Sequence, residues 1–164
     1  MAVQKPLVII NGQIQQIPAG DTLSAPSSVA EVDLVNASND NPGAITVGCP
    51  VYVSGANSVD KARANASATC KVFGLVKDTS IASSSSGMIQ TDGILVASTA
   101  QWDAVTGQTG GLTPGAIYYL DDTAAGKLTT TAPTSSGAYV YIVGNALSST
   151  DLNIDTDRTG VLLA

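Results

Sequence analysis

The chain has 164 residues, of which 44% are hydrophobic, 12% are charged and only 4% are aromatic, and its net charge is −6. This length suits a single domain, and the hydrophobic share is enough for a core built mainly from Val, Ile, Leu and Ala. The charged share is about half of that in an average soluble protein, which excludes a charge-rich disordered tail. A surface so poor in charge favours extensive contact with other protein.

The charge is unevenly distributed along the chain. Residues 1–82 carry five basic against six acidic side chains, whereas residues 83–164 carry two basic against seven acidic side chains. Such an acidic balance repels phosphate groups, so we expect neither nucleic acid nor a membrane surface as a partner. No signal peptide is visible, and no apolar run approaches the roughly 20 residues that a membrane span needs. These features predict a soluble protein made in the cytoplasm.

The two cysteines, Cys49 and Cys70, are too few for the disulfide framework of a small secreted protein. We therefore expect two buried free thiols. A disulfide between neighbouring strands remains an alternative that the sequence does not decide.

The N-terminal segment predicts a β-hairpin over residues 7–17, because Asn11-Gly12 favours a tight type I′ turn. Residues 22–30 have the Ser, Pro and Ala content of a linker. The predicted organisation is an arm with its linker, residues 1–28, followed by a β-rich body, residues 29–164. The fold class expected is all-β, an antiparallel β-sandwich or barrel with at most one short helix.

In the first half of the body, strand-like runs occur at residues 45–53, with an interruption at Pro50, and at residues 70–77. Residues 59–69 have low β-propensity and predict a loop or a helical turn. Residues 88–96 predict two short strands joined by the turn Thr91-Asp92-Gly93.

The second half begins with a predicted short helix at residues 100–105, capped by Ser98 or Thr99 and ended by Gly107. A Gly-rich turn then leads into residues 110–122 and a further strand at 128–131, which together predict a hairpin. Strands at residues 139–143 and 152–154 complete the series. Strands that recur this often with turn residues between them are typical of a sandwich or barrel.

The chain lacks histidine and has a single glutamate, Glu31. The absence of histidine removes the Ser-His-Asp arrangement and most zinc sites. Asp92, Asp121 and Asp122 lie in predicted turns, where aspartate serves the backbone. We therefore predict no enzyme activity, no cofactor, and no catalytic, cofactor-binding or metal-binding residue.

Two further motifs have alternative interpretations. Residues 151–157 resemble the start of an EF-hand calcium loop, but Thr156 and Leu162 stand where that loop needs Gly and Glu. Alternation in a strand explains the segment better, with Leu152 and Ile154 pointing inward. Trp102, the only tryptophan, is expected to anchor the packing of the short helix rather than to bind a ligand.

Several segments together resemble small β-rich structural proteins of tailed-bacteriophage virions, of the capsid decoration (head fibre) or tail fibre type. The segments that carry the resemblance are residues 5–23, 47–53, 72–76, 101–107, 111–120 and 143–147. The resemblance implies a β-rich and often trimeric protein without catalytic residues.

We therefore expect a non-enzymatic virion structural protein that decorates or cements the capsid as a homotrimer. Its partners would be other copies of itself and the major capsid protein or other virion proteins. The alternative is a tail fibre or receptor-binding component, in which Tyr118, Tyr119, Tyr139 and Tyr141 would contact the host; one tyrosine of each pair is expected to be buried. The assembly contacts are expected in the arm, at Leu7, Val8, Ile9, Ile10, Ile14 and Ile17.

Overall fold

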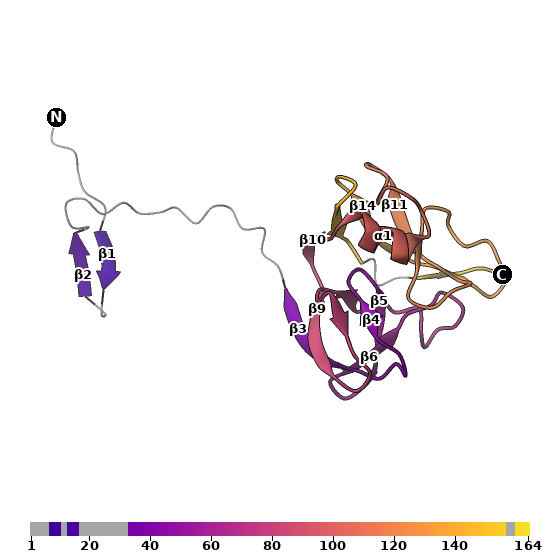
Figure 1. The fold of residues 1–164 in the computed structure, drawn as a ribbon, viewed down its shortest axis with the longest axis horizontal. Coiled ribbons are helices and arrows are strands. Elements are labelled where there is room, and N and C mark those ends of the chain that lie inside the picture. The colour runs from indigo at the N-terminus through magenta and orange to yellow at the C-terminus, as the bar shows by residue number, and fades with distance from the viewer. Residues whose placement is uncertain (1–6, 11–12, 17–32, 157–159) are drawn as a thin grey trace.

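The computed structural model describes residues 7–10, 13–16, 33–156 and 160–164. It confirms the all-β fold class, with one short helix and several sheets (Figure 1). None of the helices in the described part of the chain is long and apolar enough to cross a membrane.

The predicted N-terminal hairpin is confirmed. Strand β1 (Leu7–Ile10) pairs antiparallel with β2 (Gln13–Gln16), with Ile10 opposite Gln13 across the two-residue connection. Residues 17–32 lie outside the described part of the chain, so the predicted linker and the boundary at residue 28 remain predictions.

The first half of the body forms a small closed barrel in the strand order β3-β6-β5-β7-β9. Its strands are β3 (Leu34–Asn39), β5 (Pro50–Gly55), β6 (Ser58–Lys61), β7 (Gly74–Val76) and β9 (Ser86–Gln90). The barrel is not wholly antiparallel, because β3 and β6 run parallel. Strands β4 (Ile45–Thr46) and β8 (Ser80–Ile81) occur between the barrel strands in the sequence and pair with each other in a separate two-stranded sheet.

Two local predictions for this half were wrong in detail. The expected loop at residues 59–69 begins with a strand, β6. The expected strand at 45–53 is divided into β4 and β5 by a turn in which Gly48 has a φ of 79°. The two strands predicted within residues 88–96 are confirmed, on either side of the predicted turn. They do not pair with each other: β9 closes the barrel, whereas the next strand joins a different sheet.

The second half of the body is a five-stranded antiparallel sheet, here called the main sheet, in the order β10-β15-β14-β11-β12. Its strands are β10 (Gly93–Val96), β15 (Asp151–Ile154), β14 (Ile142–Ala146), β11 (Ile117–Leu120) and β12 (Leu128–Thr129). The predicted hairpin of β11 with β12 is confirmed, with Leu120 opposite Leu128. A short ribbon pairs β13 (Tyr139–Val140) with β16 (Val161–Leu162).

Helix α1 (Thr99–Thr106) confirms the predicted helix and both of its caps. The Ser98 side chain accepts a hydrogen bond from the Gln101 amide, while the Gln101 side chain accepts one from the Ser98 amide. This capping box satisfies amides that the first helical turn leaves unpaired. Gly107 ends the helix in the left-handed conformation, with a φ of 69°.

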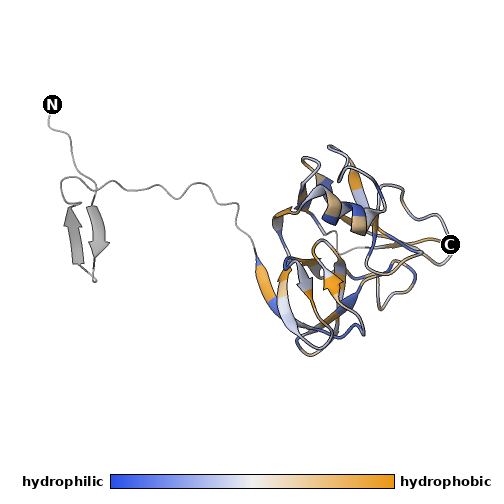
Figure 2. Ribbon diagram, in the orientation of Figure 1, coloured by the Kyte–Doolittle hydropathy of each residue, from blue (hydrophilic) through white to orange (hydrophobic). Residues whose placement is uncertain are grey.

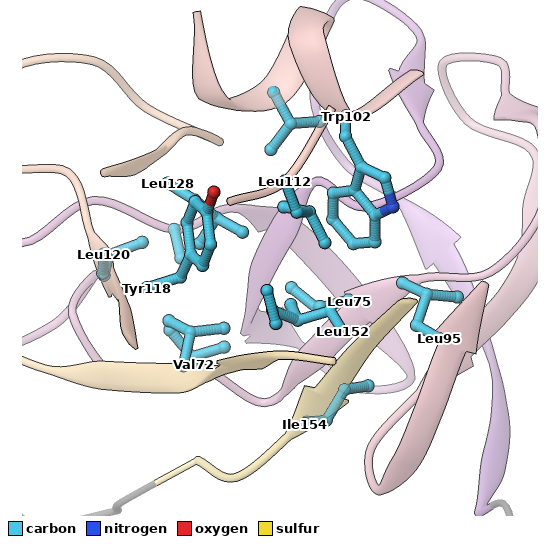
Figure 3. Packing of buried hydrophobic residues seen from close by; sticks show 14 of the residues in the cluster. Val72, Leu75, Leu95, Trp102, Leu112, Tyr118, Leu120, Leu128, Leu152 and Ile154 are labelled. Atoms are coloured by element: carbon cyan, nitrogen blue, oxygen red, sulfur yellow. The ribbon is translucent and has the colours of Figure 1, made fainter. Parts of the chain in front are cut away.

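Two groups of buried side chains hold the body together. One fills the barrel and includes Ile45, Val51, Val59 and Ile89. The larger group lies between the main sheet, α1 and segments of the barrel half, with Trp102 and Leu75 among its fully buried members (Figure 3). This shared core joins the two halves, and apolar and polar residues are interspersed along the strands around it (Figure 2).

Candidate interaction surface

The aspartates considered as candidates for chemistry serve the backbone of turns. The Asp121 carboxylate accepts hydrogen bonds from the Thr123 and Ala124 amides at 2.6 and 2.8 Å, and Asp92 accepts one from the Gly93 amide at 2.7 Å. Burial alone would raise the pKa of Asp121, but the hydrogen bonds of Thr123 and Ala124, with nearby Arg63, lower it below its usual value. The turn interpretation of these residues is confirmed.

The calcium-like segment is a strand. In β15 the side chains of Leu152 and Ile154 are buried and those of Asp151 and Asn153 are half-buried, as alternation predicts. A hollow of about 290 Å³ near the end of this strand is lined by Asp33, Asp92 and Asp155, among others. Among the described residues, no group of three His, Cys, Asp or Glu side chains could hold a metal ion.

The large aromatic side chains belong mainly to the core. Trp102 is fully buried, and its indole Nε1 donates a hydrogen bond to the Thr150 carbonyl at 2.8 Å, so its predicted packing role is confirmed. Tyr118 is fully buried, and its hydroxyl donates to Gln108 Oε1 at 2.6 Å. Tyr141 is also buried, whereas Tyr119 and Tyr139 are half-buried. One member of each tyrosine pair is thus in the core, as predicted.

A second hollow, of about 310 Å³, lies on the barrel half and is lined by aromatic and aliphatic side chains with one charge, Lys71. Tyr52, Phe73 and Tyr141 line it, and Tyr141 also belongs to the larger core group. The described residues that line this hollow include no carboxylate or thiol, so they offer packing contacts rather than acid–base chemistry.

Both cysteines are buried free thiols, as predicted. Burial raises the pKa of the Cys49 thiol to about 12, although the nearby Lys61 and Lys127 charges oppose this effect. Burial also raises the pKa of Cys70. Thiols held in the protonated form are poor nucleophiles, so neither residue is equipped for thiolate catalysis.

The Cys49 thiol should make the protein less stable in alkali. Because its pKa is raised in the folded state, the unfolded chain loses this proton first, and stability falls as the pH rises from about 9 towards 12. One such proton contributes a slope of up to about 1.4 kcal/mol per pH unit. Urea unfolding between pH 8 and 10.5 should show a shallower decline for Cys49→Ala than for the unsubstituted protein. Equal slopes in the two proteins would contradict this assignment.

Several large apolar side chains of the body are exposed rather than buried in the two cores. The larger ones are Leu34, Val35, Val53, Val96, Ile117, Leu147, Val161 and Leu162. Leu34 and Val35 stand where the chain enters β3 and are visible as an apolar segment there (Figure 2). Val96 and Ile117 belong to the main sheet, and Leu147 follows β14 directly.

The outer face of the main sheet combines these apolar side chains with amides. Across the sheet, Ile94 is opposite Asn153, which is opposite Asn145, which in turn is opposite Ile117. The two asparagine side chains are joined by a hydrogen bond of 3.2 Å. This face therefore carries no charge along its central row, which suits contact with protein more than contact with an ionic ligand.

The structure places most of the predicted assembly residues in one hairpin. Leu7, Val8, Ile9 and Ile10 form β1, and Ile14 lies in β2 opposite Ile9. Ile17 lies outside the described residues. The contacts expected of these six residues remain a prediction.

Comparison with known proteins gives a likeness to solved structures but no sequence match. No family model matches the chain, and no curated protein matches it either. Among solved structures, the chain is similar to one in the capsid of the Myoviridae phage XM1. The two chains are 17% identical and superpose with a TM-score of 0.47, over 89% of this chain and 94% of the other.

Sequence reasoning missed the exposed apolar residues of the body, above all Val96. A signal was present, since Ile94-Leu95-Val96-Ala97 is an uninterrupted apolar run. Such a run is typical of a strand that is buried on both faces. The structure instead places it at the margin of the main sheet, with Val96 57% exposed.

Proposed function

We propose that this chain is a non-enzymatic structural protein of a tailed-phage virion, which decorates or cements the capsid as a homotrimer. The arm, residues 1–28, would attach the protein to the shell or to neighbouring copies, and the body, residues 29–164, would project outward. The sequence segments that resemble virion proteins motivate this role.

The observation that carries the proposal is the N-terminal hairpin. Its two strands contain five aliphatic residues and no charge over residues 7–16. An isolated two-stranded hairpin is marginally stable in water, so such a segment gains most by packing against another protein surface. The sequence places a 16-residue stretch, residues 17–32, between this hairpin and the described body.

The candidate chemistry of the body supports a structural role. The turn aspartates bind amides, the aromatic side chains fill the core, and the thiols are held protonated. Eight large aliphatic side chains of the body are also exposed, and they suit subunit contacts. Symmetric oligomers commonly cover such surfaces, which motivates the trimer.

Deleting residues 1–20 is expected to abolish attachment to the virion while the body stays folded. The test compares the amount of this protein on purified particles when the full chain or the truncated chain is supplied during assembly. Urea unfolding of the two purified proteins checks that the body is intact, because the core residues in the described part of the chain all lie after residue 36.

A matched control replaces residues 21–28 with Gly and Ser at unchanged length, which keeps the hairpin on a tether of the same reach. This variant should bind particles at the level of the full chain. Truncated protein at full occupancy would overturn the proposal. Imaging of whole particles then separates many copies on the head, as proposed, from few copies at the tail, as a fibre component would show.

A further inference from the structure

Strand β10 forms an unusual edge of the main sheet. It is the terminal strand of the sheet order and pairs with β15 alone among the described strands. Its residues Ile94, Leu95 and Val96 are all aliphatic, and Val96 is 57% exposed. Proteins normally protect such edges with charges, proline, bulges or short length, because an apolar edge invites pairing with another chain. Strand β10 contains neither a charge nor a proline, and its pairing with β15 has no bulge over its four residues.

The backbone of β10 is arranged to accept a further strand. The Ala97 amide donates to the Thr150 carbonyl at 3.0 Å, which places residue 97 in a hydrogen-bonded pair with β15. Hydrogen-bonded positions alternate along an antiparallel strand, so Leu95 also faces β15. The backbone groups of Ile94 and Val96 therefore point to the open edge.

The opposite edge of the same sheet is different. Strand β12 has only two residues, Leu128 and Thr129, and a lysine precedes them. The Lys127 ammonium donates a hydrogen bond to the Ala104 carbonyl near the end of α1. A charged residue precedes both edge strands, Asp92 before β10 and Lys127 before β12, so the difference lies in length: β12 has the shortness that discourages pairing. The barrel, being closed, presents no edge at all.

The described body begins beside the start of β10. The Asp33 carbonyl accepts a hydrogen bond from the Thr91 amide at 2.9 Å, so the body begins next to the crossover from β9 to β10 (Figure 1). The 16 residues from 17 to 32 can span roughly 50 Å when extended. Connections within a compact domain are usually only about 4–6 residues long. A connection of this length is therefore better suited to carry the hairpin to a neighbouring copy than to return it to the same body.

We propose that the open edge of β10 receives the β1–β2 hairpin of a second copy of this chain, which extends the main sheet by β-strand addition. Strand β1 is aliphatic at all four positions, as β10 is from Ile94 onward, and neither strand carries a charge. A strand that is apolar on both faces matches an edge that is apolar on both faces. The inference rests on the proposed assembly role of the arm and assigns its partner.

Cysteine cross-linking between two differently tagged copies tests this pairing. One full-length copy carries Val96→Cys, the other carries Ile9→Cys, and the two are mixed and mildly oxidised; the native thiols are buried. A disulfide-linked dimer with both tags is expected as the main product. The control pairs Ile9→Cys with Thr129→Cys on the opposite edge, and only background linkage is expected. Equal linkage at both edges, or none at Val96, would overturn the proposal.

A chain that carries both Ile9→Cys and Val96→Cys distinguishes exchange from closure within one copy. Linked dimers and larger species are expected, whereas a linked monomer as the main product would overturn the assignment to a second copy.

A charge substitution separates this proposal from the function on which it rests. Val96→Lys should reduce cross-linking and oligomer formation, whereas Thr46→Lys, at an exposed threonine in β4, should leave both unchanged. If Val96→Lys assembles like the unsubstituted protein while the arm deletion does not attach, the β10 pairing is wrong and the role of the arm stands. If the arm deletion also attaches fully, the proposed function itself is wrong.

Discussion

Replacing Trp102 with alanine is expected to lower the free energy of unfolding by about 3–5 kcal/mol, the usual cost of removing a large buried aromatic side chain. The indole is fully buried and packs among the side chains that join α1 to the main sheet (Figure 3). Its ring also lies against the backbone at Gly48, where an added Cβ would approach the ring to 2.7 Å. The substitution therefore opens a cavity between the barrel half and the main sheet, and it also removes the donor to the Thr150 carbonyl.

This effect is measured by urea unfolding with circular dichroism as the signal. Fluorescence is not suitable, because Trp102 is the only tryptophan and its signal is lost in the variant. Trp102→Phe is the matched control: it keeps an aromatic ring but loses part of the volume and the hydrogen bond, so an intermediate loss is expected. Folded proteins are stable by only about 5–15 kcal/mol, so the alanine variant should unfold at a clearly lower urea concentration. A loss below about 1 kcal/mol for Trp102→Ala would contradict the role of this side chain as the link between the two halves.

The sequence predicted those parts of the fold that local chemistry decides. The caps of α1 follow from Ser98 and Gly107, because each satisfies the backbone of the helix end beside it. The β1–β2 and β11–β12 hairpins follow from turn residues that separate two strand-like segments. The alternation of buried and half-buried residues in β15 follows from the period of a strand.

The parts that it did not predict depend on distant partners. The turn Thr91-Asp92-Gly93 resembles a hairpin turn, but β9 pairs with β3 and β7 while β10 pairs with β15. Strand β6 was missed because its own β-propensity is low. It is a strand because it pairs with β5 on one side and with β3, in parallel, on the other, and this pairing closes the barrel.

Of the two candidate interaction surfaces, the sequence predicted the arm but not the open edge of β10. The apolar arm is visible in the sequence because Leu7–Ile10 precedes a strong turn signal. The open edge at β10 is not visible there, because an apolar run of four residues gives no indication of whether a strand is central or terminal. Only the sheet order, with β15 on one side and no described strand on the other, identifies it as an edge.

Replacing Gly144 with alanine should be nearly as damaging as the loss of Trp102, although it adds only one methyl group. Gly144 lies in β14 between two partner strands, opposite Tyr118 and Ile154. A Cβ at this position would stand 2.2 Å from the Asn153 carbonyl oxygen and 3.1 Å from its carbon. Both atoms are backbone, so the clash cannot be relieved by a side-chain rotation. Relief requires β15 to move away from β14, which would also strain its pairing with β10.

We therefore expect Gly144→Ala to lower the free energy of unfolding by about 3 kcal/mol, the upper end of the usual cost of overpacking. Trp102 fluorescence during urea unfolding measures it, since the indole binds the Thr150 carbonyl one residue before β15 and reports on that strand. Gly55→Ala is the matched control in β5, where the nearest atoms to an added Cβ are 3.8 Å away, and its effect should stay within roughly 0.5 kcal/mol. Because β15 also holds β10, Gly144→Ala should weaken the cross-link between Val96→Cys and Ile9→Cys, whereas Gly55→Ala should not. Equal stability of the two glycine variants would mean that β14 and β15 are not packed as closely as their register requires.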